Sequence, residues 1–313
     1  AARPDRTDVV VALGSFTLPG SLFRLEGDRT SLQALAAAEL PYDPAALHVE
    51  HERYGSLDGT PVGLFTITAA GHAASSETPT ILTGYGGFAV TMSPAYSPLA
   101  IAVAERGGQV AVAGLRGGSE EGEAWHRAGM LAEKERVFED FEAAADHLVA
   151  TGRTSSERLA IRGGSNGGLL VAAALTRRPD LCRAVHCAVP LTDMVRYPEF
   201  LIARLWVPEY GDPDDAEAFE VLHRYSPYHR AVAGEGTCYP AVLVTTGEED
   251  SRVDPNHARK LAAALQTSTS CPDEHPILVR VESSAGHGQG KPVGRQADEA
   301  ADVLSFLWWQ LGA

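Results

Sequence analysis

The sequence predicts an α/β protein with a mostly parallel central sheet that helices cover on both faces. From residue 78 onward, apolar runs of strand length alternate with longer segments that have helical periodicity. The strand-like runs are apolar throughout, which is typical of parallel strands that are buried on both faces. With 313 residues, of which 44% are hydrophobic, the chain has enough material for a large core.

The sequence predicts the following strands and helices along the chain. Residues 9–16 and 21–27 are predicted as short β runs, and the alanine-rich residues 31–40 as a small helix. Residues 49–70 predict a hairpin with its turn at Asp58 and Gly59. The remaining strands are predicted at 78–86, 109–117, 158–164, 182–190, 239–250 and 276–283. The helices between and after them are predicted at 98–107, 134–152, 166–180, 254–266 and 295–310, the second of these ending at Gly152.

Charge and hydropathy exclude several classes of partner. The net charge is −15, with 41 acidic and 26 basic residues and no block of Lys and Arg, so we expect no nucleic-acid partner. The apolar runs are much shorter than the roughly 20 residues that cross a bilayer, so we expect no membrane span. No zinc, EF-hand, Walker or dinucleotide spacing is present, so we expect no metal and no cofactor.

The cysteines predict a reduced protein. Four cysteines, at positions 182, 187, 238 and 271, are too few and too irregular for a disulfide scaffold in a chain of this length. Cys182 and Cys187 flank a predicted buried strand and are interpreted as core residues. The first residues show no signal-peptide pattern, so a cytoplasmic location is the default, and a secreted form whose signal has been removed stays open.

The stretch "GGSNG" places Ser165 in Gly-x-Ser-x-Gly form, after a predicted strand and before a predicted helix. This is the context of a nucleophile elbow, in which the serine has a strained backbone and only glycine fits beside it. The backbone N–H of Asn166 would then face an oxyanion at the start of the helix. Glycine-rich turns of this kind also bind phosphates, so the pentapeptide alone leaves both readings open.

A serine nucleophile needs a histidine base and an orienting carboxylate. Asp250 follows the strand predicted at 239–250, and His287 follows the strand predicted at 276–283. Ser, then Asp, then His is the chain order of the α/β-hydrolase fold. Three neighbouring acidic residues compete with Asp250 for this role, namely Glu248, Glu249 and Asp254.

Several longer motifs resemble one family. In order, "GYGGFAVTMSPAYS", "VAGLRGGSEEGEAWHRAGMLAEKERVFEDF", "GGSNGGLL", "EDSRVDPNHARK" and "AGHGQGK" are similar to the catalytic domain of the prolyl oligopeptidase family of serine peptidases, in particular to its prolyl-endopeptidase-like members. The resemblance covers nearly the whole chain. It implies that Ser165 attacks the scissile carbonyl, that His287 is general base and then acid, and that Asp250 orients the imidazole. It also implies that the Tyr85 hydroxyl and the Asn166 N–H bind the oxyanion.

The same resemblance implies a substrate-binding set. Arg252 would bind a substrate carbonyl next to the cleaved residue, since its guanidinium is a fixed, charged fork of donors. Trp206 would stack on a proline ring, with Tyr210, Phe88 and Val253 as further pocket wall. Aromatic residues at such positions are also common as plain core, and some members of the family accept alanine instead of proline.

The sequence departs from the family pattern in the segment before the hydrolase domain. Family members carry a β-propeller before the hydrolase domain, whereas here only residues 1–48 resemble the end of its last blade, and residues 49–313 are the predicted hydrolase domain. The chain is therefore predicted to be part of a larger propeller-containing protein or a propeller-free hydrolase. The first hypothesis for function is a peptidase that cleaves after proline in oligopeptides. The alternatives are an esterase, thioesterase or peptide ligase or cyclase on the same scaffold, and a non-catalytic binding protein, against which the triad argues.

Overall fold

The computed structural model describes residues 8–26, 31–283, 285–288 and 291–313. The chain divides into two compact units. The smaller unit comprises residues 1–50, 66–73 and 93–110, and the larger one residues 51–65, 74–92 and 111–313. Every residue of the candidate site belongs to the larger unit.

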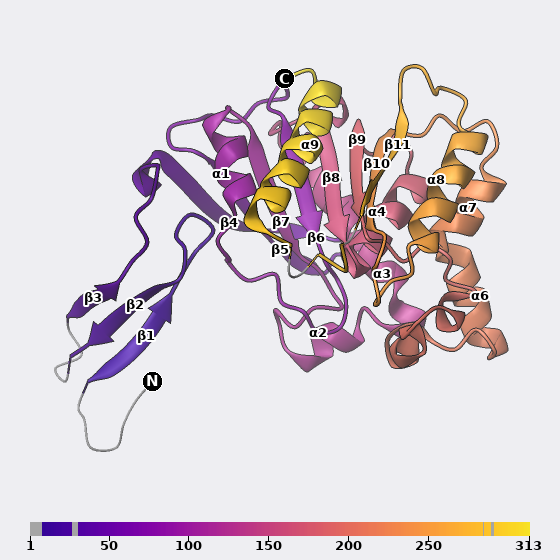
Figure 1. The fold of residues 1–313 in the computed structure, drawn as a ribbon, viewed down its shortest axis with the longest axis horizontal. Helices are drawn as coiled ribbons and strands as arrows, with labels where there is room; N and C mark the ends of the chain where they lie inside the picture. Colours follow the sequence, from indigo (N-terminus) through magenta and orange to yellow (C-terminus); the bar gives the residue numbers. More distant parts are fainter. Residues whose placement is uncertain (1–7, 27–30, 284, 289–290) are drawn as a thin grey trace. The chain divides into compact units, whose positions relative to one another are not determined.

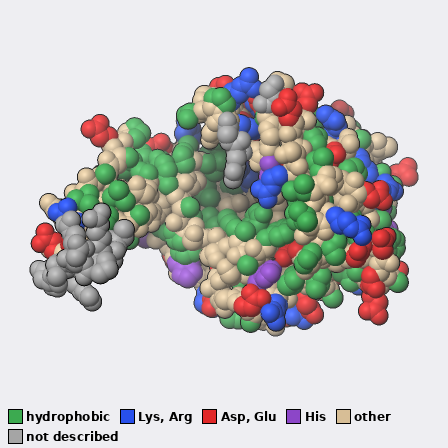
Figure 2. Space-filling model, turned by 60° about the horizontal axis from the view of Figure 1, so that its bottom comes forward, with side chains coloured by type: hydrophobic (Ala, Val, Ile, Leu, Met, Phe, Trp, Pro, Cys, Tyr) green, Lys and Arg blue, Asp and Glu red, His purple; other side chains and the backbone are tan. Residues whose placement is uncertain are grey.

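The described residues of the smaller unit include a three-stranded antiparallel sheet and an α-helix (Figure 1). Its elements are β1 (Val9–Leu13), β2 (Ser21–Leu25), β3 (Leu32–Ala36) and α1 (Pro98–Glu105). Ser97 caps α1, since its side chain accepts a hydrogen bond from the N–H of Ala100, and Pro98 suits the first helical position. Leu13, Leu22 and Leu32 of the sheet are about half exposed, and Figure 2 shows hydrophobic side chains on the surface of this part.

One prediction in this unit is wrong. Residues 31–40 were expected to form a small helix, but residues 32–36 form strand β3. The strand pairs antiparallel with β2, with Leu25 opposite Leu32 and Leu22 opposite Ala36. Helix propensity is a weak preference, and the backbone pairing with β2 overrides it.

The main sheet has eight strands in the order β11-β10-β9-β8-β6-β7-β5-β4. The strands are β4 (Leu47–Gly55), β5 (Pro61–Ala69), β6 (Thr80–Gly84), β7 (Gln109–Gly114), β8 (Leu159–Gly164), β9 (Ala184–Ala188), β10 (Ala241–Gly247) and β11 (Ile277–Glu282). The neighbours from β6 to β11 are parallel, for instance with Ile161 opposite Val185 and Val244 opposite Val279. The predicted fold class is therefore confirmed, and the strand order is that of an α/β hydrolase.

Helices cover the sheet of the larger unit. They are α2 (Glu123–Arg127), α3 (Glu135–Ala150), α4 (Asn166–Arg177), α5 (Val207–Tyr210), α6 (Ala216–Tyr225), α7 (Pro227–Ala233), α8 (Asn256–Ser268) and α9 (Val293–Leu311). Helix α9 crosses in front of the central strands in Figure 1 and contacts β8, β9 and β10. Helices α3, α4, α7 and α8 pack successively against one another. Helix α3 buries the side chains of Val137, Phe141 and Leu148 at helical spacing, and it is followed by Gly152 with φ +71°.

The elements predicted beyond residue 78 are present, and the hairpin turns at Asp58 and Gly59 as expected. Residues 190–240 received no helix in the prediction, yet they contain α5, α6 and α7. None of the helices in the described part of the chain combines the length and the apolar character that a membrane crossing requires.

The cysteines divide into two pairs. Cys182 and Cys187 are buried, as predicted, and burial raises the pKa of the Cys182 thiol to about 12. Cys238 and Cys271 form a disulfide, so the expectation of a fully reduced protein is wrong for them. The bond joins the loop before β10 to the loop after α8. These loops also share backbone hydrogen bonds, such as that from the N–H of Ser270 to the carbonyl of Thr237 at 3.0 Å.

Candidate active site

Ser165 lies on the tight turn between β8 and α4. Its backbone has φ +59° and ψ −119°, a conformation that a residue with a Cβ rarely adopts. The N–H of Ser165 donates to the carbonyl of Ala188 at the end of β9, at 2.9 Å. The turn is therefore anchored to the neighbouring strand, and the strain is held in place by the sheet.

The glycines around Ser165 allow close backbone contacts. A Cβ on Gly163 would lie 2.0 Å from the carbonyl oxygen of Gly167, and a Cβ on Gly168 would lie 2.8 Å from that of Ala188. A Cβ on Gly164 would have its nearest neighbour at 3.7 Å, which is an ordinary contact. Clearance for the crossing of α4 over the strand ends explains Gly163 and Gly168, but it does not explain Gly164.

The structure brings Ser165, Asp250 and His287 together from three separate loops at the carboxyl ends of β8, β10 and β11. The Nε2 of His287 lies 3.0 Å from the Ser165 Oγ, and its Nδ1 lies 2.6 Å from the Asp250 Oδ2. An ionised carboxylate only accepts hydrogen bonds, so Nδ1 carries the proton and Nε2 is left to accept that of the serine. This is the arrangement that activates a serine hydroxyl.

Asp250 is buried, with 4% of its surface exposed, and it is held in place by the backbone. Its Oδ1 accepts from the N–H groups of Arg252 at 2.9 Å and Val253 at 3.0 Å. Burial raises the pKa of the Asp250 carboxyl, but hydrogen bonds from His287 and from these two N–H groups outweigh it and bring the pKa below its ordinary value. The carboxylate is therefore ionised throughout the neutral range.

The acidic residues that competed with Asp250 in the sequence are placed differently. Glu248 and Glu249 are exposed. Asp254 accepts a hydrogen bond from the N–H of Asn256, at the start of α8. Of these carboxylates, the one that contacts His287 is that of Asp250.

Tyr85 follows β6, and its side chain interacts with that of Ser165. Burial raises the pKa of Tyr85, while the hydrogen bond with Ser165 and the charge of Arg252 lower it, and the net pKa is above the ordinary value. The hydroxyl is therefore protonated and able to donate. Asn166 is the first residue of α4, where backbone N–H groups lack partners within the helix. The two expected oxyanion donors thus both lie next to Ser165.

The aromatic residues of the predicted substrate pocket form one cluster. The rings of Phe88 and Trp206 meet edge to face at 6.5 Å, and those of Phe88 and Tyr210 at 5.5 Å. Trp206 directly precedes α5 and is partly buried, while Tyr210 ends α5 and is fully buried. Val253 is also buried, whereas the side chain of Arg252 is exposed. Tyr210 is thus a core residue behind the cluster, and Trp206 and Phe88 offer the ring surface that is accessible.

Three ionisable residues near the site were not predicted from the sequence. The Nζ of Lys134 lies 2.8 Å from the carbonyl oxygen of Gly86 and 3.2 Å from the Oε1 of Glu209. The Oε2 of Glu209 lies 2.9 Å from the Nε2 of His126. A lysine at the start of a helix usually indicates a solvated position, so the sequence carried no signal for this buried cluster.

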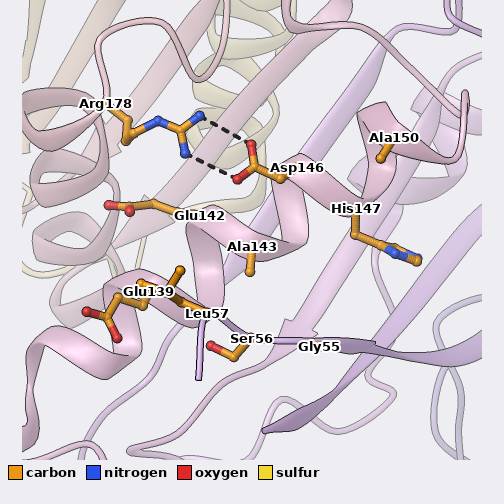
Figure 3. A pocket seen from close by; sticks show the side chains of 10 residues that line it. All are labelled: Gly55, Ser56, Leu57, Glu139, Glu142, Ala143, Asp146, His147, Ala150 and Arg178. Atoms are coloured by element: carbon orange, nitrogen blue, oxygen red, sulfur yellow. Dashed lines mark hydrogen bonds and ion pairs between the residues drawn. The ribbon is translucent and has the colours of Figure 1, made fainter. Parts of the chain in front are cut away.

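Two other places in the larger unit bring polar side chains together. A cavity of about 460 Å³ beside α3 (Figure 3) is lined by Glu142, Asp146 and Arg178 among others. Arg178 pairs with Asp146, and Glu142 with Arg177, and we assign no function to this cavity. Among the described residues, Cys238, Cys271 and His275 also have donor atoms within 4.8 Å of one another, but in the disulfide the two sulfurs are not the thiolates that a metal binds.

A strained serine on a strand-to-helix turn, within reach of a histidine that is itself bound to a buried carboxylate, defines a serine hydrolase of the α/β-hydrolase fold. A sequence model described as the prolyl oligopeptidase family matches residues 94–313, which is well over half of the chain. The chain belongs to this family of serine peptidases.

Individual proteins and solved structures that are similar to this chain carry names from the same family. The prolyl endopeptidase of Elizabethkingia meningoseptica is 38% identical over 306 residues, which cover 97% of this chain and 43% of that protein. A solved structure from a study of two prolyl endopeptidases is 43% identical with a TM-score of 0.94, covering 100% of this chain and 46% of the other. Prolyl oligopeptidase B from Galerina marginata, solved with a 35mer hydrolysis and macrocyclization substrate, is 32% identical with a TM-score of 0.93, covering 100% of this chain and 44% of the other. The chain thus spans less than half the length of these relatives.

Proposed function

We propose that the protein is a serine peptidase that hydrolyses peptide bonds on the C-terminal side of proline in oligopeptides. The observation that carries the proposal is the contact of the His287 Nε2 with the Ser165 Oγ at 3.0 Å, with Asp250 on the other side of the imidazole. Relatives named prolyl endopeptidase and prolyl oligopeptidase support the choice of substrate.

In the acylation step, the Ser165 Oγ attacks the carbonyl carbon of the scissile bond while its proton moves to the Nε2 of His287. The negative charge that develops on the carbonyl oxygen is stabilised by the Tyr85 hydroxyl and the Asn166 N–H. Asp250 stabilises the imidazolium that forms and keeps its proton on Nδ1. When the C–N bond breaks, His287 returns its proton from Nε2 to the leaving amine, and the acyl group remains on Ser165.

Deacylation repeats the same steps with water. His287 accepts a proton from the water that attacks the ester carbonyl, and the same two donors stabilise the second oxyanion. The ester bond breaks as His287 gives the proton to the Ser165 Oγ. The free carboxyl product leaves, and the enzyme returns to its starting protonation state without any cofactor.

Proline recognition is assigned to the aromatic cluster. A pyrrolidine ring offers surface and no hydrogen-bond donor, so a flat apolar wall suits it. We assign the stacking position to Trp206, with Phe88, Tyr210 and Val253 behind it. Arg252 is exposed and its backbone N–H donates to Asp250, and we assign to its guanidinium the carbonyl that precedes the proline.

We further propose that residues 1–48 are the end of a propeller blade and that residues 49–313 are the hydrolase domain. The three-stranded antiparallel sheet with half-exposed leucines supports this, because a blade buries such side chains against further strands. A propeller in the full-length protein would restrict substrates to short peptides. The sequence favours a cytoplasmic location, but the disulfide between Cys238 and Cys271 favours an oxidising compartment instead.

The test is the release of a fluorescent amine from a blocked Gly-Pro amide, with the Gly-Ala amide beside it and Ser165→Ala as control. We expect strong preference for proline, and no activity in the variant. Equal cleavage of both amides would contradict the substrate assignment. Mass spectrometry of a longer proline peptide then separates hydrolysis from acyl transfer, since hydrolysis adds one water and transfer to an amine does not.

A further inference from the structure

Residues 85–89, called here the oxyanion loop because Tyr85 begins it, are tied to α5 through the side chain of Asn166. The Asn166 Nδ2 donates to the carbonyl of Tyr85 at 2.5 Å, and its Oδ1 accepts from the hydroxyl of Tyr210 at 2.8 Å. Asn166 is 2% exposed, and its amide has one partner on each side. The residue that supplies a backbone donor to the oxyanion therefore also connects the loop to the aromatic cluster.

A second connection runs parallel to the first. The Lys134 Nζ donates to the carbonyl of Gly86, the next residue of the loop, and pairs with Glu209, the residue before Tyr210 on α5. Lys134 is 1% exposed, and its Nζ lies 5.2 Å from the centre of the Tyr210 ring. Successive carbonyls of the loop are thus each held by a buried side chain that also holds α5.

The oxyanion loop needs such support because its backbone is strained. Phe88 and Ala89 have φ of +56° and +54°, in the left-handed region that residues with a Cβ avoid. Gly86 has φ +66°, and a Cβ there would lie 2.2 Å from the Cγ1 of Val137. Strained backbone of this kind persists only where surrounding contacts hold it in one conformation.

Burying a lysine to hold the Gly86 carbonyl costs desolvation free energy, which indicates that Lys134 serves to position the loop. Burial lowers the pKa of Lys134, while the charge of Glu209 and its hydrogen bond oppose this change. Glu209 in turn contacts His126 on α2. The Lys134 Nζ is thereby fixed between two residues that are distant in sequence. Gly86 lies 48 residues before Lys134, and Glu209 lies 75 residues after it.

We propose that Lys134 and Glu209 are positioning residues that fix the oxyanion loop against α5, so that the Tyr85 hydroxyl stays at Ser165. Neither side chain touches the reacting atoms. The proposal rests on the proposed function only in requiring that an oxyanion forms at Ser165. Losing Lys134 leaves the aromatic cluster in place through Asn166 and Tyr210, so the rate of acylation is affected more than substrate binding.

The test is a double-mutant cycle between Lys134→Met and Tyr85→Phe, measured on a p-nitrophenyl ester and on the Gly-Pro amide. Loss of one oxyanion donor costs on the order of 10²-fold in rate, so we expect Tyr85→Phe to lower kcat by about that factor and Lys134→Met by about 10-fold or more. KM should stay within about twofold, and the double variant should be no slower than Tyr85→Phe alone. Losses that multiply would show that Lys134 does not act through Tyr85.

Two further variants separate positioning from general stability. Lys260→Met is the matched control, because Lys260 also pairs with a buried carboxylate, that of Asp193, but contacts neither the loop nor α5. Its effect on kcat should be small and should multiply with that of Tyr85→Phe. If Lys134→Met fails to fold because Glu209 is left as a lone buried charge, the double variant Lys134→Met/Glu209→Gln removes both charges and takes its place in the cycle.

A measurement without turnover completes the test. In crystals of Lys134→Met or of the double variant, we expect the Tyr85 hydroxyl to lie farther from the Ser165 Oγ than in the wild type, and an unmoved Tyr85 would overturn the proposal. The ester contains no proline. A wild type that cleaves the ester but shows no proline preference therefore refutes the proposed substrate, while the cycle on the ester still decides the position of Tyr85.

Discussion

The two ends of the parallel strands hold polar side chains in different ways. At the carboxyl ends, Tyr85 follows β6, Ser165 follows β8, Asp250 follows β10 and His287 follows β11. These groups meet through hydrogen bonds that can exchange a proton, such as the 3.0 Å contact between Ser165 and His287. This end is organised for reaction.

At the amino ends, the loops are fastened to one another. Cys238, before β10, is joined to Cys271 by the disulfide. His275, before β11, lies 2.7 Å from the carbonyl oxygen of Tyr239 and contacts Arg183, which precedes β9. The side chains of the proposed active site and the contacts that join the loops thus lie at opposite ends of the same strands. Substitutions at the carboxyl ends should therefore affect the reaction rate, and those at the amino ends the stability of the fold.

The largest expected effect is that of Ser165→Ala. Removing the nucleophile of a triad costs on the order of 10⁶-fold in kcat, while the midpoint of thermal unfolding should hardly change. Labelling by a fluorophosphonate should disappear with activity. The control is Ser156→Ala, which changes a serine just before the amino end of the same strand, β8, and should leave both the rate and the labelling intact. Persistent labelling of Ser165→Ala would place the nucleophile elsewhere.

Asp250→Asn should cost about 10⁴-fold in kcat, because an amide can donate to Nδ1 and hold the wrong tautomer of His287. The pKa of Asp250 is lowered by folding, so its carboxylate stabilises the fold above its ordinary pKa and loses this effect as the pH falls through the folded value. The difference in thermal stability between wild type and variant should therefore shrink on acidification below about pH 4. A difference that grows instead would contradict the lowered pKa.

Trp206→Ala should act on the substrate rather than on the chemistry. The lost ring surface is worth about 2 kcal/mol, so kcat/KM for the Gly-Pro amide should fall roughly 30-fold. Hydrolysis of a small aryl ester, which has no ring to stack, should change little. Equal losses on both substrates would mean that Trp206 supports the fold of α5 instead of contacting proline.

The smallest effect on activity is expected at the amino ends. Replacing Cys238 and Cys271 by serine should leave kcat within about twofold but lower the free energy of unfolding by about 3–4 kcal/mol, from the entropy of a loop of 33 residues. Reduction of the wild type with dithiothreitol should have the same effect, and it should not alter the variant. A large loss of activity in the variant would show that the two ends of the sheet are not independent.

The sequence predicted the parts of this molecule that depend on local pattern. Buried strands such as β8 and β10 were found because a strand covered on both faces is apolar throughout. The proposed triad was selected because Ser165, Asp250 and His287 each follow a strand in the chain order of the fold, and the structure places the three side chains in contact. The aromatic cluster came only from the family resemblance, since Trp206 in its own segment is typical of plain core.

The parts that were missed depend on contacts between distant residues. The composition of residues 31–40 predicted a helix. Residues 32–36 form strand β3 instead, because pairing with β2 decides their conformation. The disulfide joins residues 33 apart, and no local signal pairs them. Lys134 precedes an ordinary amphipathic helix, and its burial follows from the position of Gly86, 48 residues earlier. These side chains could be assigned only once the loops had been placed in space.

The uneven clearance around Ser165 has a consequence for which sequences can build this turn. Gly163 and Gly168 face backbone atoms that cannot retreat, whereas the position of Gly164 has room for a methyl group and no positive φ. In a saturation library of the elbow, position 164 should therefore accept alanine, while positions 163 and 168 should admit glycine alone. Position 164 is therefore the place where a natural or designed sequence can vary next to the nucleophile without changing the backbone of the turn.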